Sequence, residues 1–166
     1  MTEYLKKTVA NYQPLNPISF LVKAAKIFPD SKSIVYNNIE YRWAETFERC
    51  SLFASALQKI GLKKGDVVGF VAANTPELYE AHFSVPMAGM VLNAINYRLD
   101  SKTIAYIIDH AEIKLLVVDK EFSSIIAESV KRSKIKPILI DIDDPHLSGG
   151  ELLGSLDYER FLTTGS

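Results

Sequence analysis

The chain has 166 residues, 48% of them hydrophobic and 23% charged, and its formal net charge is −1. These values are typical of one folded globular domain and exclude a disordered or fibrous chain. The nearly balanced charge also argues against partners held by long-range electrostatics, such as nucleic acids or anionic membranes.

The single cysteine, Cys50, excludes an internal disulfide and fits a reducing compartment. Phe47, Ala54 and Leu57 share a helical face with it, so we expect the thiol in the core. No apolar run approaches the ~20 residues that span a bilayer. The start of the chain, Met1–Lys7, lacks the apolar stretch of a secretory signal. We therefore expect a cytoplasmic protein without a transmembrane segment.

The chain begins with a polar, turn-rich stretch, and we expect residues 1–15 to form a strap over a neighbouring surface. Asn16 and Pro17 then predict the start of a helix, because Asn caps helices and Pro fits their first position. The helix is expected to end at Pro29. One buried stripe is predicted from apolar residues at helical spacing, namely Phe20, Leu21, Ala24, Ile27 and Phe28.

A short β-hairpin is predicted next, from the stretches Ser33–Tyr36 and Ile39–Trp43. Asn37 and Asn38 lie between them, and asparagine tolerates the left-handed backbone that a two-residue hairpin turn needs. A long amphipathic helix is then expected from about residue 44 to residue 60.

Apolar runs alternate with helical patterns in the next part of the chain. The runs are Val67–Ala72, Met90–Ile95, Leu115–Val118 and Pro137–Ile140. Unbroken apolar runs predict strands covered on both faces, and helices between them predict parallel pairing. The expected fold class is α/β, an open, doubly wound and mainly parallel sheet with flanking helices and a small N-terminal β-hairpin. Residues 16–145 would form this sheet subdomain, and residues 146–166 a loop with a short helix.

Polar residues follow two of the predicted strands, at the edge where open α/β sheets bind their ligands. Asn74 precedes a helix start at Thr75, and Asn96 and Arg98 follow the next strand. Asn74, Asn96 and Arg98 are candidate cofactor-binding residues, because helix N-termini, amides and guanidinium groups bind phosphates. In the alternative interpretation, Thr75 only caps its helix, Asn96 only shapes a turn, and Arg98 is solvated. Helix capping, turn formation and solvation are commoner for these residue types than phosphate binding.

The sequence predicts no metal site. His82, His110 and His146 are too far apart for metal-ligand spacing, and His82 is expected to be a packed, hydrogen-bonded helix residue. The carboxylates of Asp141–Asp144 lack the glycine and final glutamate of a calcium loop, so we interpret them as a solvated turn. Glycine-rich nucleotide motifs and the G-x-S-x-G nucleophile motif do not occur in the sequence.

Several segments between Asn16 and Asp144 share their order and spacing with one enzyme family. They are Tyr41–Glu45, Gly61–Gly69, Ala73–Glu77 and Ala81–Asp100. The longest resembles the second core motif of medium-chain fatty acid and aromatic acyl-CoA ligases. On these motifs, the chain resembles part of the N-terminal domain of an acyl-CoA synthetase, within the adenylate-forming or AMP-binding superfamily.

The resemblance implies a reaction in two steps. A carboxylate attacks the α-phosphate of Mg-ATP to give an acyl-adenylate and pyrophosphate, and the thiol of CoA then displaces AMP. ATP, Mg and CoA are therefore the cofactors expected of the full-length family. Its Ser/Thr/Gly-rich phosphate loop, ending in Pro-Lys-Gly, does not occur before Ser166. No catalytic residue can be assigned on this basis, and no cofactor is expected for the isolated chain.

Three interpretations of the isolated chain follow from these observations. The first is an N-terminal fragment of such a synthetase, which is inactive alone because the phosphate loop and later motifs are missing. The second is a non-catalytic interaction module, whose uncovered apolar face binds another copy or the remainder of the synthetase. The third is a CoA- or nucleotide-binding module that kept ligand binding without the chemistry.

Overall fold

The computed structural model describes residues 7–8 and 10–166. The predicted strap, residues 1–15, falls partly outside this set and stays a prediction. Within the described residues, no helix is long and apolar enough to cross a bilayer.

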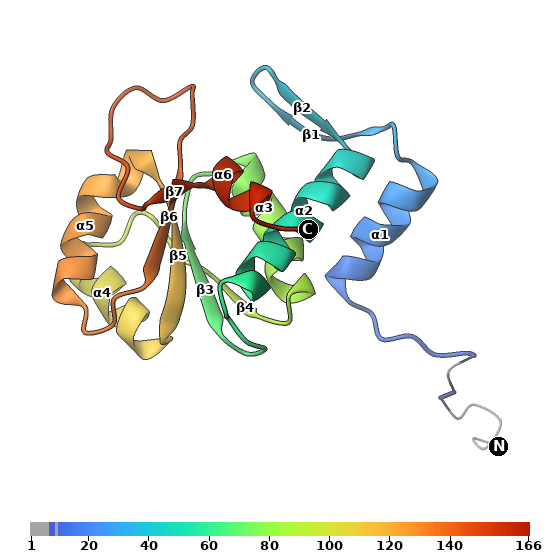
Figure 1. The fold of residues 1–166 in the computed structure, drawn as a ribbon, viewed down its shortest axis with the longest axis horizontal. Helices are drawn as coiled ribbons and strands as arrows, with labels where there is room; N and C mark the ends of the chain where they lie inside the picture. Colours follow the sequence, from blue (N-terminus) through green and yellow to red (C-terminus); the bar gives the residue numbers. More distant parts are fainter. Residues whose placement is uncertain (1–6, 9) are drawn as a thin grey trace.

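A five-stranded, entirely parallel sheet forms the centre of the molecule (Figure 1), and its strands lie in the order β4-β3-β5-β6-β7. The strands are β3 (Val67–Val71), β4 (Val91–Ala94), β5 (Ile113–Asp119), β6 (Ile138–Ile142) and β7 (Leu156–Asp157). The connecting helices are α3 (Pro76–Met87), α4 (Ser101–His110) and α5 (Ser123–Arg132), the last preceded by the 3-10 turn η2 (Lys120–Phe122). The predicted α/β fold with a parallel sheet is confirmed, with β7 as an additional short strand.

Helices cover both faces of the sheet, which explains the unbroken apolar runs of its strands. Alternate side chains of β5 point to opposite faces. Leu115 and Val117 join the core on the side of α3 and of the helices α2 (Trp43–Lys59) and α6 (Tyr158–Thr163). Leu116 and Val118 join the core with α4 and α5.

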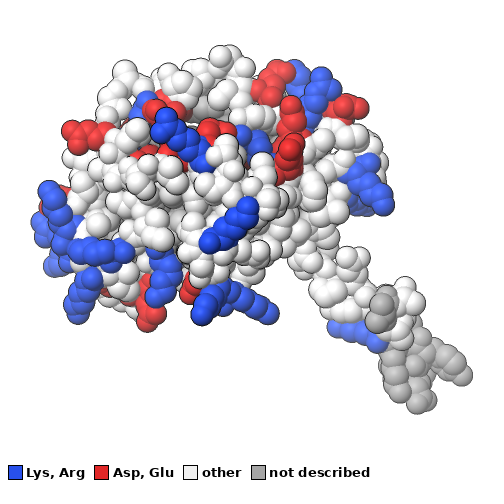
Figure 2. All heavy atoms as spheres, in the orientation of Figure 1, with Lys and Arg blue, Asp and Glu red and all other residues white. Residues whose placement is uncertain are grey.

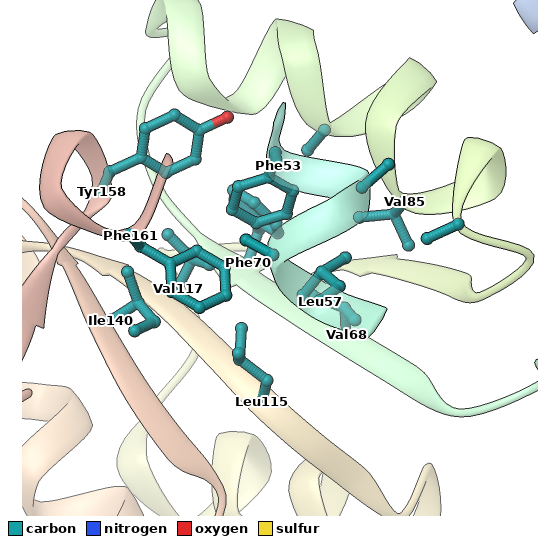
Figure 3. Close-up of a cluster of buried hydrophobic side chains, with 14 of the residues drawn as sticks. Phe53, Leu57, Val68, Phe70, Val85, Leu115, Val117, Ile140, Tyr158 and Phe161 are labelled. Atoms are coloured by element: carbon teal, nitrogen blue, oxygen red, sulfur yellow. The ribbon is translucent and has the colours of Figure 1, made fainter. Parts of the chain in front are cut away.

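Aromatic rings concentrate in the first of these cores (Figure 3). Phe53 of α2 stacks on Tyr158 with 4.9 Å between ring centroids, and it meets Phe161 edge-on at 5.4 Å. Phe70 of β3 lies 6.0 Å from Phe53. All four rings are buried, so they hold α2 and α6 together on the sheet. Cys50, one helical turn before Phe53, is buried as predicted.

The N-terminal β-hairpin lies outside the main sheet. It consists of β1 (Lys32–Tyr36) and β2 (Ile39–Arg42), which pair antiparallel with Tyr36 opposite Ile39. Asn37 adopts the left-handed backbone conformation with φ 52°. The hairpin is therefore confirmed, and the reason given for its turn holds for Asn37, whereas Asn38 has no positive φ.

The first helix, α1 (Pro17–Ile27), begins as predicted, because Asn16 Oδ1 accepts a hydrogen bond from Ser19 N at 2.9 Å. The predicted buried stripe on this helix is wrong. Leu21 is buried, but Phe20 is 58% and Ile27 52% exposed. The reason is that α1 lies on the outside of α2 and α3 and presents only one side to them.

Replacing Phe53 by Ala is expected to lower the free energy of unfolding by about 3–5 kcal/mol, because it empties a fully buried ring site. Phe20→Ala is the matched control, since it removes the same ring from a mostly exposed position, and it is expected to cost less than about 1 kcal/mol. Urea unfolding followed by circular dichroism measures both values. Equal losses for the two variants would contradict the assignment of the core.

Candidate functional site

The carboxyl edge of the sheet contains one point where the order of the strands reverses. From β3 the chain crosses to β4 on one side, and then to β5 on the other side of β3. The segments that leave β3 and β5 therefore diverge. Ala73 and Asn74 follow β3, and Asp119 ends β5. In open α/β sheets, a ligand usually binds in the crevice at such a point.

A cavity of about 400 Å³ opens between β1 and the start of α3. Its lining residues are Ser33, Ile34, Val35, Tyr36, Asn74, Thr75, Pro76, Leu78, Tyr79 and His82. None of them is an Asp, Glu, Lys or Arg, so the cavity suits an apolar group with a few hydrogen-bonding atoms rather than a polyphosphate. His82 Nδ1 lies 2.8 Å from the Leu78 carbonyl oxygen, so this ring is hydrogen-bonded within its helix as predicted, although it is exposed.

Thr75 occupies the N-cap position of α3, in agreement with the alternative interpretation. Its carbonyl oxygen accepts the hydrogen bond from Tyr79 N at 3.2 Å. Its buried hydroxyl makes no capping hydrogen bond, but it lies near the Glu77 carboxyl, where it opposes the rise in pKa that burial causes. Because Glu77 already places a carboxyl in the first turn of α3, this helix end is a poor seat for an anionic ligand.

Tyr36 fixes the hairpin beside the cavity. Its hydroxyl donates a hydrogen bond to Asp144 Oδ2 at 2.5 Å, and its ring meets His146 edge-on with 6.0 Å between centroids. The hydrogen bond to the Asp144 carboxylate, together with burial, raises the pKa of Tyr36 to about 12. The hydroxyl therefore stays protonated at neutral pH and ties the hairpin to the loop after β6.

The interpretation of Asp141–Asp144 as a solvated turn is wrong for two of its carboxylates, because Asp141 and Asp144 are buried. Asp141 accepts hydrogen bonds from Leu153 N at 2.9 Å and from Gly154 N at 2.7 Å, so it holds the loop that leads into β7. In the described part of the chain, no three His, Cys, Asp or Glu side chains gather as a metal site.

The three predicted binding residues do not form one site. Asn74 lines the cavity, whereas Asn96 and Arg98 follow the edge strand β4 and are not among its lining residues. Asn96 Oδ1 accepts a hydrogen bond from Arg98 N at 2.9 Å, which is the turn-shaping role of the alternative interpretation. The Arg98 guanidinium lies over the Tyr97 ring, 5.6 Å from its centroid.

A partly buried ionisable cluster on α2, α3 and α6 was not predicted from the sequence. Arg49 Nε donates a hydrogen bond to Glu80 Oε1 at 2.5 Å, and its two terminal nitrogens donate to Glu159 at 2.9 and 2.6 Å. The Tyr158 hydroxyl donates to Glu80 Oε2 at 3.0 Å. The Glu80 side chain has no exposed surface. The cluster therefore joins the three helices of one face around a buried carboxyl group.

Burial raises the pKa of Glu80 to about 7, although Arg49 and the Tyr158 hydroxyl stabilise its charged form. Carboxyls with such a pKa are often catalytic. Glu80, however, does not line the cavity, and both of its oxygens have partners, so we assign it a structural role. Helical spacing gives no signal for it, because the residues one turn away on the same face, Pro76 and Ser84, form no apolar stripe in the sequence although both are buried.

Comparisons with known proteins point to one enzyme class. Residues 21–159 match the AMP-binding enzyme family. A peroxisomal acetate/butyrate–CoA ligase of Arabidopsis thaliana is 39% identical in an alignment 174 positions long, which covers 97% of this chain and 30% of the relative. A peroxisomal trans-cinnamate:CoA ligase of Petunia hybrida is 49% identical over 118 residues, or 71% of this chain and 21% of that enzyme.

Solved structures show the same fold at low sequence identity. An anthranilate CoA ligase in complex with anthranoyl-AMP matches with a TM-score of 0.81 and 17% identity, over 96% of this chain and 30% of that one. A benzoate CoA ligase from Burkholderia xenovorans matches with a TM-score of 0.78 and 17% identity, over 92% and 29%. The chain thus spans about a third or less of the length of the proteins it matches.

The pKa of Glu80 predicts how stability depends on pH. The pKa of Glu80 is raised from 4.5 to about 7 in the folded state, so folding favours the protonated form. The contribution of Glu80 to the free energy of unfolding is fully present below about pH 4.5. It is lost as the pH rises through about 7, and the loss amounts to up to about 3 kcal/mol. Urea unfolding between pH 4.5 and 7.5 should show this loss, and Glu80→Gln should abolish it.

Glu159→Gln is the matched control, because it removes a carboxylate of the same cluster that is 59% exposed. This variant is expected to keep the pH dependence of the original chain. If Glu80→Gln unfolded with an unchanged dependence on pH, the pKa assigned to Glu80 would be wrong.

Proposed function

Because the chain belongs to the AMP-binding enzyme family, we propose that it forms the N-terminal sheet layer of an ATP-dependent acyl-CoA ligase. The observation that carries this proposal is the match of nearly the whole chain to CoA ligases, in sequence and in strand arrangement. Since the chain spans only about 30% of the curated relatives, the complete reaction is proposed for the larger protein.

The proposed reaction joins a carboxylic acid to CoA. The carboxylate attacks the α-phosphate of Mg-ATP and releases pyrophosphate, and the CoA thiol then attacks the acyl carbonyl and releases AMP. We propose a short- to medium-chain fatty acid or an aromatic acid as substrate. This choice is supported by relatives named as butyrate, benzoate and trans-cinnamate CoA ligases.

Within such a ligase, the chain would supply scaffold and cavity wall rather than catalytic groups. The cavity beside β1 has no charged lining residue, and the buried carboxyl of Glu80 is fully engaged with Arg49 and Tyr158. The sequence of 166 residues also contains no Ser/Thr/Gly-rich loop ending in Pro-Lys-Gly. We therefore propose that residues 1–166 alone do not form an acyl-adenylate.

Localisation in the cytoplasm is also a proposal, because several relatives carry peroxisomal in their names. A fluorescent fusion of the whole protein, imaged with a peroxisomal marker, would decide between the two compartments.

The purified chain is expected to show no ATP–pyrophosphate exchange above background with Mg-ATP and C4–C12 fatty acids or benzoate. The physical reason is that the cavity beside β1 has no charged lining residue that could neutralise the phosphates in the transition state. A full-length benzoate CoA ligase serves as the positive control. Exchange above background from the chain alone would overturn the proposal of an inactive unit.

A second candidate function is weak binding of ATP or CoA without chemistry, at Arg98 and the neighbouring Asn96 after β4, apart from Asn74 in the cavity. It is supported by the exposed Arg98 guanidinium, which has no carboxylate partner among the described residues. Titration calorimetry with ATP and with CoA tests it. Arg98→Ala should weaken binding about tenfold, as expected for loss of one charge-assisted contact. No heat from either ligand would exclude this function.

A further inference from the structure

We propose that the edge of the sheet at which its strands begin is a binding surface for a membrane that contains anionic lipids. This surface, called the basic edge below, is formed by Lys63, Lys64, Lys114, Lys131 and Lys134. It lies at the opposite end of the strands from the cavity beside β1. The inference therefore goes beyond the proposed function, which does not require this edge.

Three stretches of the chain carry these lysines, and each leads into one of three neighbouring strands. Residues 59–66 precede β3, residues 109–114 lie at the start of β5, and residues 128–136 precede β6. Because these strands are parallel, their starts meet at the same edge of the sheet. The three stretches hold eight of the 19 Lys and Arg but only four of the 20 Asp and Glu. The net charge of −1 is therefore an average over a positive edge and a more acidic remainder.

Figure 2 shows this separation of charge. Lys and Arg prevail along the lower left of the view, over the region where α5 ends and where β5 and β6 begin in Figure 1. Asp and Glu are more frequent along the upper side, towards the ends of the strands. A face with one prevailing sign of charge attracts partners of the opposite sign, even when the whole chain is nearly neutral.

Contacts between the loops join the three stretches into one surface. Asp109 Oδ1 accepts hydrogen bonds from Lys134 N at 2.8 Å and from Ile135 N at 2.9 Å, which ties the end of α4 to the turn after α5. A hollow of about 280 Å³ is lined by Gly65 and Lys114 among others, so the loop before β3 lies beside the start of β5. The lysines are therefore neighbours along one edge.

The ammonium groups of the basic edge are available to another molecule. All five lysines are exposed, and in the described part of the chain none forms an ion pair with a carboxylate. Asp66 and Asp109 accept hydrogen bonds from backbone N–H groups instead. Lys59, Arg132 and Lys136 have partners of their own and are not counted in the surface. Exposed ammonium groups of this kind bind phosphate oxygens.

Exposed aliphatic side chains at the same edge favour a lipid surface as the partner. Val91, the first residue of β4, is 51% exposed, and Ile138, the first residue of β6, is 47% exposed. Such side chains can enter the headgroup region while neighbouring lysines bind lipid phosphates. A nucleic acid would be held by the lysines alone. An acidic protein would need a shaped apolar pocket, whereas Asp66 and Glu112 line the hollow at this edge.

The test is co-sedimentation of the purified chain with phosphatidylcholine vesicles that contain about 30% phosphatidylserine, and with vesicles of phosphatidylcholine alone. Binding is expected only to the anionic vesicles. It should be lost when the salt concentration is raised from about 0.05 M to about 0.5 M, because salt screens exposed charges.

Two double variants locate the binding surface. Lys131→Gln with Lys134→Gln, and Lys63→Gln with Lys64→Gln, should each weaken binding to the anionic vesicles at least about tenfold, since each lysine near such a surface contributes about fivefold. Lys23→Gln with Lys26→Gln is the matched control. It removes the same charge from α1, away from the basic edge, and should leave binding unchanged.

Each outcome decides the proposal. No binding to the anionic vesicles, or equal binding to both kinds of vesicle, overturns it. An equal loss in the control variant would assign the effect to net charge and also overturn it. Equally tight binding of duplex DNA or polyglutamate at the same salt concentration would show a surface for polyanions in general, contrary to the proposal. The variants replace exposed side chains, so their melting temperatures should match that of the original chain. The assay contains neither ATP nor an acid substrate, so its result is independent of the proposed function.

Discussion

The hydrogen-bonded contact between Arg49 and the buried carboxyl of Glu80 is the interaction on which the helical side of the structure depends. A carboxylate without exposed surface is strongly destabilising unless it is paired and hydrogen-bonded. Arg49 satisfies Glu80 and also holds Glu159, so α6 cannot move away from α2 without disturbing both charges. The same pair fixes α3, whose first turn lines the cavity. The sheet and the aromatic core supply burial, and this polar contact joins α2, α3 and α6 to one another.

The fold could be predicted where local chemistry decides it. Apolar runs predict strands with both faces covered, as in β3 and β5, and Asn37 accepts a backbone conformation that most residues avoid. The prediction failed for α1, because periodicity shows which residues are apolar but not how many neighbours a helix has. It failed for Asp141 and Asp144 for a related reason. Short carboxylates near a strand end can be solvated or can accept backbone hydrogen bonds, and the sequence does not distinguish these cases.

The candidate site was only half predictable. Asn74 was expected at the carboxyl end of a strand, and it lines the cavity there. Asn96 and Arg98 also follow a strand, but the position of the crevice depends on which strands are neighbours. The crevice lies between β3 and β5, and β4, which Asn96 and Arg98 follow, lies on the other side of β3. That order is set by crossover connections between distant segments. Tyr36 contributes from the hairpin, far away in sequence, through its hydrogen bond to Asp144.

Both borders of the sheet are short, since β4 has 4 residues and β7 has 2. Unpaired backbone groups on an edge strand can pair with a strand of another chain, and short edge strands limit this strand addition. Filament-like growth through the backbone is therefore disfavoured for this chain, even though its helical side is apolar. A partner molecule therefore has to bind through side-chain contacts. Such binding selects for a complementary surface, whereas pairing with an edge strand would accept any extended peptide.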